Sequence, residues 1–159
     1  MTDIFLDTKK QIENLGFNVI GHDFNRPWGG FLLIDESQSN EFITKFISNE
    51  KFKIENKVSP KILIIKPNSR LSWQFHHRRK EIWKVFKNDV GVIRSIDNNE
   101  NEMKIFNVGD VIELEKGERH RLIGLSDFGI VAEIWIHTDP ANPSDENDIV
   151  RLHDDYARD

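Results

Sequence analysis

The sequence of 159 residues contains no cysteine, which excludes disulfide bonds and thiolate metal ligands. It also lacks long hydrophobic runs: the longest aliphatic stretches, such as residues 62–65, have the length of a strand and are far too short to cross a membrane. Residues 1–7 lack the basic start and the apolar stretch of a secretion signal. We therefore expect no membrane partner and a cytoplasmic location.

Positive charge is in the minority in this chain. It has 22 Lys and Arg residues against 27 Asp and Glu residues, which gives a formal net charge of -5. Proteins that bind nucleic acid usually present a basic face, so this composition favours no nucleic-acid partner. The basic cluster at residues 78–80 is local, and it is typical either of a solvated turn or, beside a metal, of a group that holds an anion.

The length suits one domain with a single core. Residues 8–15 carry apolar side chains at helical spacing and end before Gly16, which predicts a short helix. A second helical pattern at residues 42–47 follows Ser39 and Asn40, either of which can cap it. This second helix is predicted to be an insertion between strands.

From Lys61 onward the chain consists of short apolar runs separated by turn residues. The predicted strands are residues 62–65, 71–75, 82–86, 90–96, 103–106, 111–114, 121–123 and 130–136. This spacing favours an all-β sandwich or barrel. Residues 138–159 are polar and include Pro140 and Pro143, so composition alone predicts a loose tail.

A group of potential metal ligands stands on these predicted strands. Gln74 and His76 alternate along one strand and so share a face, and Glu81 on the next strand returns toward His76 if the two form a hairpin. His120 follows a turn that contains Gly117. Taken singly, each has an ordinary explanation: polar residues of an edge strand face solvent, and a neutral histidine has many uses.

The joint spacing of these residues resembles the two motifs of the cupin superfamily. The first motif matches from Asn68 to Asn88 and the second from Gly109 to Gly124, with glycine and asparagine exchanged at turn positions. The resemblance implies a double-stranded β-helix, also called a jelly-roll barrel, with short helices at the N-terminus and in an insertion. It implies four metal ligands: Gln74, His76, Glu81 and His120. Such a set suits one divalent ion, namely Zn, Fe(II), Mn, Co or Ni.

Within the cupins, the chain resembles the cupin domain of the type II phosphomannose isomerases. The matching segments are collinear over nearly the whole chain: residues 26–31 (RPWGGF), 71–83 (LSWQFHHRRKEIW), 120–122 (HRL), Glu133 and 147–158 (NDIVRLHDDYAR). The resemblance implies one cupin domain. It would consist of a helical extension at residues 1–25, a barrel at 26–137 and a C-terminal segment at 138–159 that closes the barrel mouth.

The resemblance also implies residues that bind a phosphate through planar guanidinium groups: Arg79, Arg121 and Arg151. For each of them, a surface salt bridge is the alternative. The chain departs from the family at Arg78, Ile82, Trp135 and Ala157. Because Trp135 shares a strand face with Glu133, these departures indicate a pocket reshaped for a sugar phosphate other than mannose phosphate, such as a heptose phosphate.

The resemblance implies a metal-dependent isomerase that interconverts aldose and ketose phosphates. The metal would polarise oxygen atoms of the sugar, Glu133 or His137 would move the proton, and Arg158 would stabilise the enediolate. Two alternatives stay open: a cupin that binds sugars without turnover, and a cupin epimerase or Fe(II) dioxygenase. Exposed strand edges give a physical reason to expect a homodimer.

Overall fold

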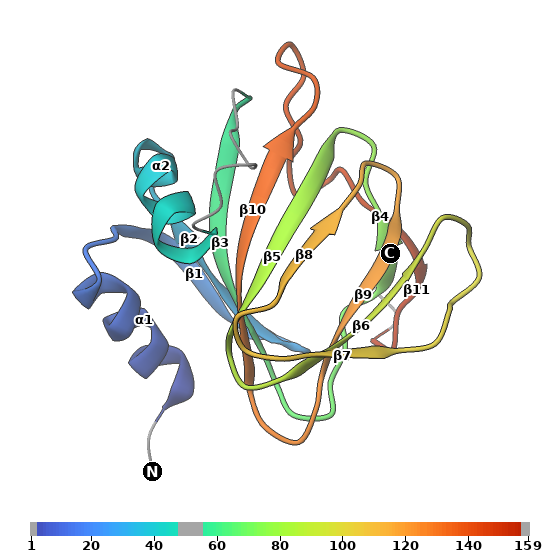
Figure 1. The fold of residues 1–159 in the computed structure, drawn as a ribbon, viewed down its shortest axis with the longest axis horizontal. Coiled ribbons are helices and arrows are strands. Elements are labelled where there is room, and N and C mark those ends of the chain that lie inside the picture. Colours follow the sequence, from blue (N-terminus) through green and yellow to red (C-terminus); the bar gives the residue numbers. More distant parts are fainter. Residues whose placement is uncertain (1–2, 48–55, 157–159) are drawn as a thin grey trace.

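The computed structural model describes residues 3–47 and 56–156, which form two antiparallel β-sheets facing each other in a jelly-roll barrel (Figure 1). The larger sheet consists, in spatial order, of β1 (Val19–Arg26), β2 (Gly29–Ile34), β3 (Val58–Ile65), β10 (Gly129–His137), β5 (Arg79–Lys87) and β8 (Val111–Leu114). The smaller sheet consists of β11 (Val150–His153), β4 (Trp73–Phe75), β9 (Arg119–Gly124), β6 (Val90–Ser95) and β7 (Lys104–Phe106). The all-β prediction is confirmed.

Two helical segments cover the outer face of the larger sheet (Figure 1). Helix α1 (Ile4–Asn14) begins after Asp3, whose carboxylate accepts hydrogen bonds from the backbone N–H groups of Phe5 and Leu6. The insertion contains a 3-10 turn (Glu36–Gln38), helix α2 (Ser39–Phe42) and a π-helical turn (Ile43–Ile47). The helices predicted at residues 8–15 and 42–47 are therefore present. Residues 1–25 are only partly helical, because β1 begins at Val19.

Three strands were not among the predicted ones: β1, β2 and β11. β1 is an edge strand with no fully buried residue, so its sequence lacks a strong apolar alternation. β11 lies in the polar tail and forms because it pairs with β4, with Arg151 opposite Gln74. Composition alone was therefore wrong about a loose tail, since the stabilising partner strand is distant in sequence.

The turn between β1 and β2 depends on one glycine. Gly29 has a φ of 148°, and a Cβ atom there would collide with the backbone carbonyl of Ile64 on β3. Because glycine has no side chain, β2 can lie against β3 at this point, with Gly29 opposite Ile65. This arrangement brings Trp28 and Phe31 to the inside of the barrel.

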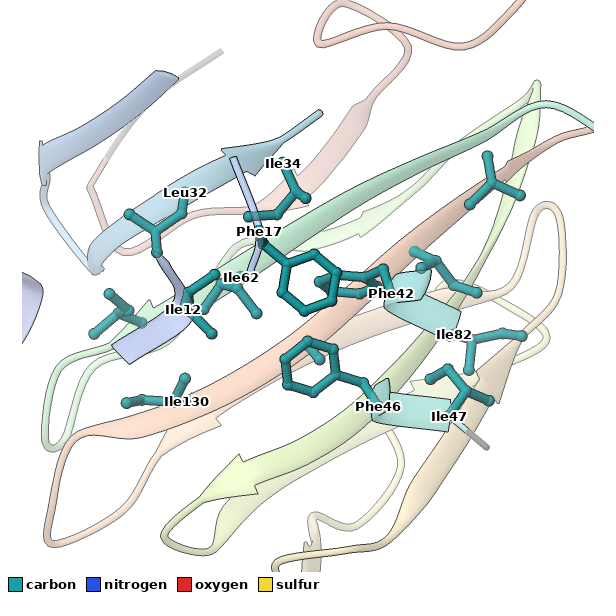
Figure 2. Packing of buried hydrophobic residues seen from close by; sticks show 14 of the residues in the cluster. Ile12, Phe17, Leu32, Ile34, Phe42, Phe46, Ile47, Ile62, Ile82 and Ile130 are labelled. Carbon is teal, nitrogen blue, oxygen red and sulfur yellow. The ribbon is translucent and has the colours of Figure 1, made fainter. Parts of the chain in front are cut away.

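The apolar core has two parts on opposite faces of the larger sheet. On the outer face, Ile130 of β10 belongs to a cluster that includes Phe17, Phe42 and Phe46 from the helical side (Figure 2). On the inner face, Val131 of the same strand belongs to a second cluster that fills the bottom of the barrel. Toward the barrel mouth, the inner positions of β10 become polar, and the candidate site lies there. Among the described residues, no helix has the length and apolar character needed to span a membrane.

Candidate metal centre

Three of the four predicted metal ligands lie together, two contributed by the smaller sheet and one by the larger sheet. His76 directly follows β4, Glu81 lies on β5 and His120 lies on β9. The Nε2 atoms of the two histidines are 3.3 Å apart, and the Glu81 carboxylate oxygens are 3.3 Å from His120 Nε2 and 3.6 Å from His76 Nε2. All three side chains are almost completely buried, so the group is enclosed by protein.

Gln74, the fourth predicted ligand, lines the cavity beside this group. It is paired with His120 in the register of β4 and β9. Its Nε2 donates a hydrogen bond to the carbonyl oxygen of Ser72 at 3.3 Å. The amide oxygen is therefore the atom that Gln74 can offer to a metal.

Both imidazoles direct Nδ1 to a backbone carbonyl and Nε2 to the centre. His76 Nδ1 lies 2.7 Å from the backbone carbonyl of Asp148, and His120 Nδ1 lies 3.0 Å from that of Glu118. A carbonyl oxygen can only accept, so each Nδ1 carries the proton. Burial lowers the pKa of His76 to about 3, which keeps this imidazole neutral. The two Nε2 atoms thus face each other beside a carboxylate, and an imidazole with its proton on Nδ1 can offer Nε2 to a divalent cation.

Charged groups around the centre favour the ionised form of Glu81. Burial opposes ionisation, but the positive charge of the Arg79 guanidinium counteracts it, and the pKa of Glu81 lies well below its usual range. Arg79 Nε donates to Glu81 at 2.8 Å, and another guanidinium nitrogen lies 3.2 Å from His76 Nε2. Arg79 also stacks on the Trp135 ring, 3.5 Å from its centroid.

Asp148 joins the C-terminal segment to the metal-binding turn. Its carboxylate accepts hydrogen bonds from the backbone N–H groups of His77 and Arg78 and from the Ser144 hydroxyl, at 2.9, 3.0 and 2.6 Å. Its backbone carbonyl orients His76. The C-terminal segment thus orients His76 through the main chain of Asp148 and holds the following turn through its carboxylate.

Three of the candidate ligands, Gln74, Glu81 and His120, line a cavity of about 410 Å³, and His76 adjoins them. This volume suits a small organic molecule. Four cationic and three carboxylate side chains line it: Arg26, Lys61, Arg79, Arg151, Glu81, Glu133 and Glu146. Of the predicted phosphate ligands, the structure brings Arg79 and Arg151 to the cavity.

Arg121 does not line this cavity. Its guanidinium is buried and bonds to the Leu71 carbonyl, to Glu100 and to His153. Successive side chains of a strand point to opposite faces, so an inward-facing His120 directs Arg121 away from the barrel interior. Arg121 therefore links β9 to β11 in this structure.

The candidate proton-transfer residues lie in different surroundings. Glu133 lines the cavity, and its two oxygens accept hydrogen bonds from the indole N–H groups of Trp83 and Trp135 at 2.7 and 2.9 Å. Burial and the nearby Glu81 charge raise the pKa of Glu133 to about 7. His137 lies outside the cavity lining, with Nε2 2.8 Å from the Ser59 hydroxyl and Nδ1 accepting from the Ser144 N–H. Arg158 falls outside the described residues.

Sequence reasoning missed Lys61, Arg26 and Glu146 as parts of the cavity. For Lys61 a signal existed, because it alternates with Leu63 and Ile65 on β3, and both belong to the inner cluster. For Glu146 no local signal exists, because its position depends on the path of the C-terminal segment.

The family model described as the C-terminal part of mannose-6-phosphate isomerase matches residues 18–154. The chain belongs to this family. The family and the two facing antiparallel sheets identify the barrel as a cupin. No curated protein matches the sequence.

Several solved structures resemble the barrel. A mutant of oxalate decarboxylase from Bacillus subtilis has a TM-score of 0.57 and 12% identity, over 83% of this chain and 30% of that one. Vicilin from tomato, Solanum lycopersicum, has a TM-score of 0.54 and 17% identity, over 86% and 34%. A Cupin 2 conserved barrel domain protein from Salinispora arenicola has a TM-score of 0.45 and 20% identity, over 57% and 70%. The chain thus spans about a third of the first two, and at these identities the likeness concerns the fold.

Proposed function

We propose that this cupin is a metal-dependent isomerase that interconverts an aldose phosphate and a ketose phosphate. The observation that carries the proposal is the composition of one cavity. Two imidazoles and a carboxylate suited to a cation, a buried carboxyl group with a pKa near neutrality, and several cationic side chains all line or adjoin it. Membership in the mannose-6-phosphate isomerase family supports the same reaction class.

A divalent metal held by His76, Glu81, His120 and Gln74 would polarise the carbonyl and hydroxyl oxygens of the sugar. The chain's own contribution to proton transfer would come from Glu133. As the base, its carboxylate takes the proton from C2 of the aldose and returns it to C1, while the hydroxyl proton of C2 passes to the oxygen of C1. Bonds and electrons balance without an oxidant, because hydrogen only changes its position within the sugar.

The surroundings of Glu133 suit this role. A pKa of about 7 means that both the ionised and the protonated form are accessible near neutral pH, as a group that takes and returns a proton requires. The indole N–H groups of Trp83 and Trp135 hold its oxygens in place. His137 is less suited, because the Ser144 N–H occupies its Nδ1 and the ring lies outside the cavity lining.

The direct test is incorporation of solvent deuterium at carbon during isomerisation of a panel of sugar phosphates, followed by NMR. We expect exchange in the metal-loaded protein and none in His76→Ala. His77→Ala is the matched control, because the His77 side chain is exposed and neighbours the centre in sequence only. Isomerisation that persists after complete chelation of the metal would exclude the proposed role of the centre.

The contacts of Arg79 favour a second candidate function, namely binding of sugar phosphates without turnover. Its guanidinium already contacts Glu81 and His76, so a positive charge is present at the ligand atoms without a metal. A thermal-shift screen of sugar phosphates followed by turnover assays separates the two candidates. Stabilisation without conversion, in protein loaded with each candidate metal, would favour the binding protein.

A further inference from the structure

The cavity has a second cationic end, away from the candidate metal centre. Lys61 on β3 is opposite Glu133 on β10, and Glu133 is in turn opposite Trp83 on β5, the strand that carries Glu81. Lys61 is therefore two strands away from the strand of Glu81. At the usual spacing of neighbouring strands this places it about 10 Å sideways from the strand that carries Glu81. The two ends of the cavity are thus far enough apart to hold different parts of one ligand.

Lys61 is held inside the protein by aromatic rings. Its ammonium nitrogen lies 4.1 Å from the centroid of the Trp135 ring and 4.9 Å from that of Phe31. Only 8% of its side chain is exposed. Burying an ammonium group is costly, and the π faces of the rings offset only part of this cost, so the position requires an anionic partner.

In this structure the partner is Glu146, from the C-terminal segment. Its carboxylate lies 2.6 Å from Lys61 Nζ and, in contrast to the lysine, 61% of its side chain is exposed. Glu146 can therefore turn into solvent at little cost, whereas Lys61 cannot follow it. An anion that enters the cavity can take the place of the Glu146 carboxylate beside Lys61.

We propose that Lys61 is the phosphate-binding residue of this cupin, and that Glu146 occupies its site until the phosphate of the substrate replaces it. Arg26 lies at the same end of the cavity, with its guanidinium 5.5 Å from the Phe31 ring, and adds to the positive potential there. Arg79 lies on the other side: its guanidinium bonds to Glu81 and contacts Trp135, which is also in contact with Lys61. The Trp135 ring thus contacts both a metal-side cation and a phosphate-side cation.

The placement of Lys61 defines the class of substrate. This step rests on the proposed function, because it takes the reacting carbons to be at the metal centre. A phosphate at Lys61 then lies at the end of the sugar remote from the carbonyl, so the substrate is a terminally phosphorylated aldose or ketose, with no phosphate at C1. Trp135, one of the positions at which the chain departs from its family, lines the cavity and contacts Lys61 and Arg79.

The test measures binding of inorganic phosphate to the metal-free protein by calorimetry. We expect Lys61→Met to weaken phosphate binding by about 10- to 100-fold, the usual loss for a charged hydrogen bond. Glu146→Gln should instead tighten phosphate binding by about threefold or more, since it removes the anion that competes for Lys61. Lys57→Met is the matched control, because it removes the same charge from an exposed ion pair with Glu36.

Two results would overturn the proposal: phosphate binding unchanged in Lys61→Met, or binding unchanged or weaker in Glu146→Gln. Circular dichroism verifies that the Lys61→Met protein is folded. Lys61→Arg, which keeps the positive charge, should retain phosphate binding. In the metal-loaded protein, Lys61→Met should raise the KM for mannose 6-phosphate and leave binding of mannose unchanged. If phosphate binds as expected but no sugar phosphate is converted, the isomerase proposal fails while the phosphate site stands.

Discussion

The two faces of strand β10 differ in composition and in what they do. On the outer face Ile130, Ala132, Ile134 and Ile136 are buried beneath the helical segments. On the inner face Val131 packs in the bottom of the barrel, whereas Glu133, Trp135 and His137 face polar partners nearer the mouth. The alternation of a strand thus lets nine consecutive buried residues serve stability on one side and chemistry on the other.

The two faces of the larger sheet also differ in how much buried charge they carry. The inner face holds Glu81, Glu133, Lys61 and Arg79 within one cavity, and each has a charged or hydrogen-bonding partner there. Such groups give little net stability, because desolvation offsets their attraction. The free energy that keeps the barrel folded must come mainly from the aliphatic outer face and the apolar floor.

The largest expected effect on stability comes from a substitution on the outer face. Ile134 is completely buried in the cluster beneath the helices, so Ile134→Ala leaves a cavity there. We expect the free energy of unfolding to fall by about 2–5 kcal/mol, measured by chemical denaturation.

Metal affinity, measured under conditions in which the Ile134→Ala variant remains folded, should be the same as in the wild type. The side chain points away from the cavity, so a comparable loss of metal affinity would contradict the separation of the two faces.

A smaller effect is expected where the C-terminal segment supports the inner face. Asp148→Ala removes the acceptor for three hydrogen bonds and frees the turn that places His76 against the Asp148 carbonyl. We expect the affinity for Zn or Mn to fall by about 10- to 100-fold, as is usual when the partner of a ligating histidine is disturbed. A competitive chelator titration measures it.

Asp139→Ala provides the control for this variant. Asp139 lies in the same segment and also accepts a backbone hydrogen bond, from Ala141, but it is exposed and away from the centre. Equal metal affinities in the two variants would show that Asp148 does not position His76.

Much of the candidate site could be predicted because it depends on local strand geometry. Gln74 and His76 share a face through alternation, and Glu81 lies on the strand that follows the next turn, so spacing alone places them near one another. The same rule would have excluded Arg121 from the cavity, because it directly follows the inward-facing His120. It would have placed Lys61 in the cavity, because Lys61 alternates with Leu63. These two errors come from applying the family resemblance without the alternation.

The remainder depends on contacts between segments that are distant in sequence. His137 shares the inner face with Glu133, as alternation predicts, but Ser59 and Ser144 engage its ring outside the cavity lining. β11 and Glu146 take their positions from β4 and Lys61, more than seventy residues earlier in the chain. No local pattern in a polar tail carries that information.

The smallest expected effect concerns the ionisation of Glu133 on the inner face. The unfolded carboxyl titrates near its ordinary pKa of 4.5, whereas burial raises the folded pKa to about 7. Between these values the folded state binds more protons than the unfolded state, so the stability of the metal-free protein falls as pH rises and levels off above about pH 7. Glu133→Gln cannot ionise, so it should remove this decline, which amounts to on the order of 1–3 kcal/mol. Urea denaturation of both metal-free proteins from pH 5 to 8 provides the measurement, and parallel profiles would mean that Glu133 is ionised normally in the barrel.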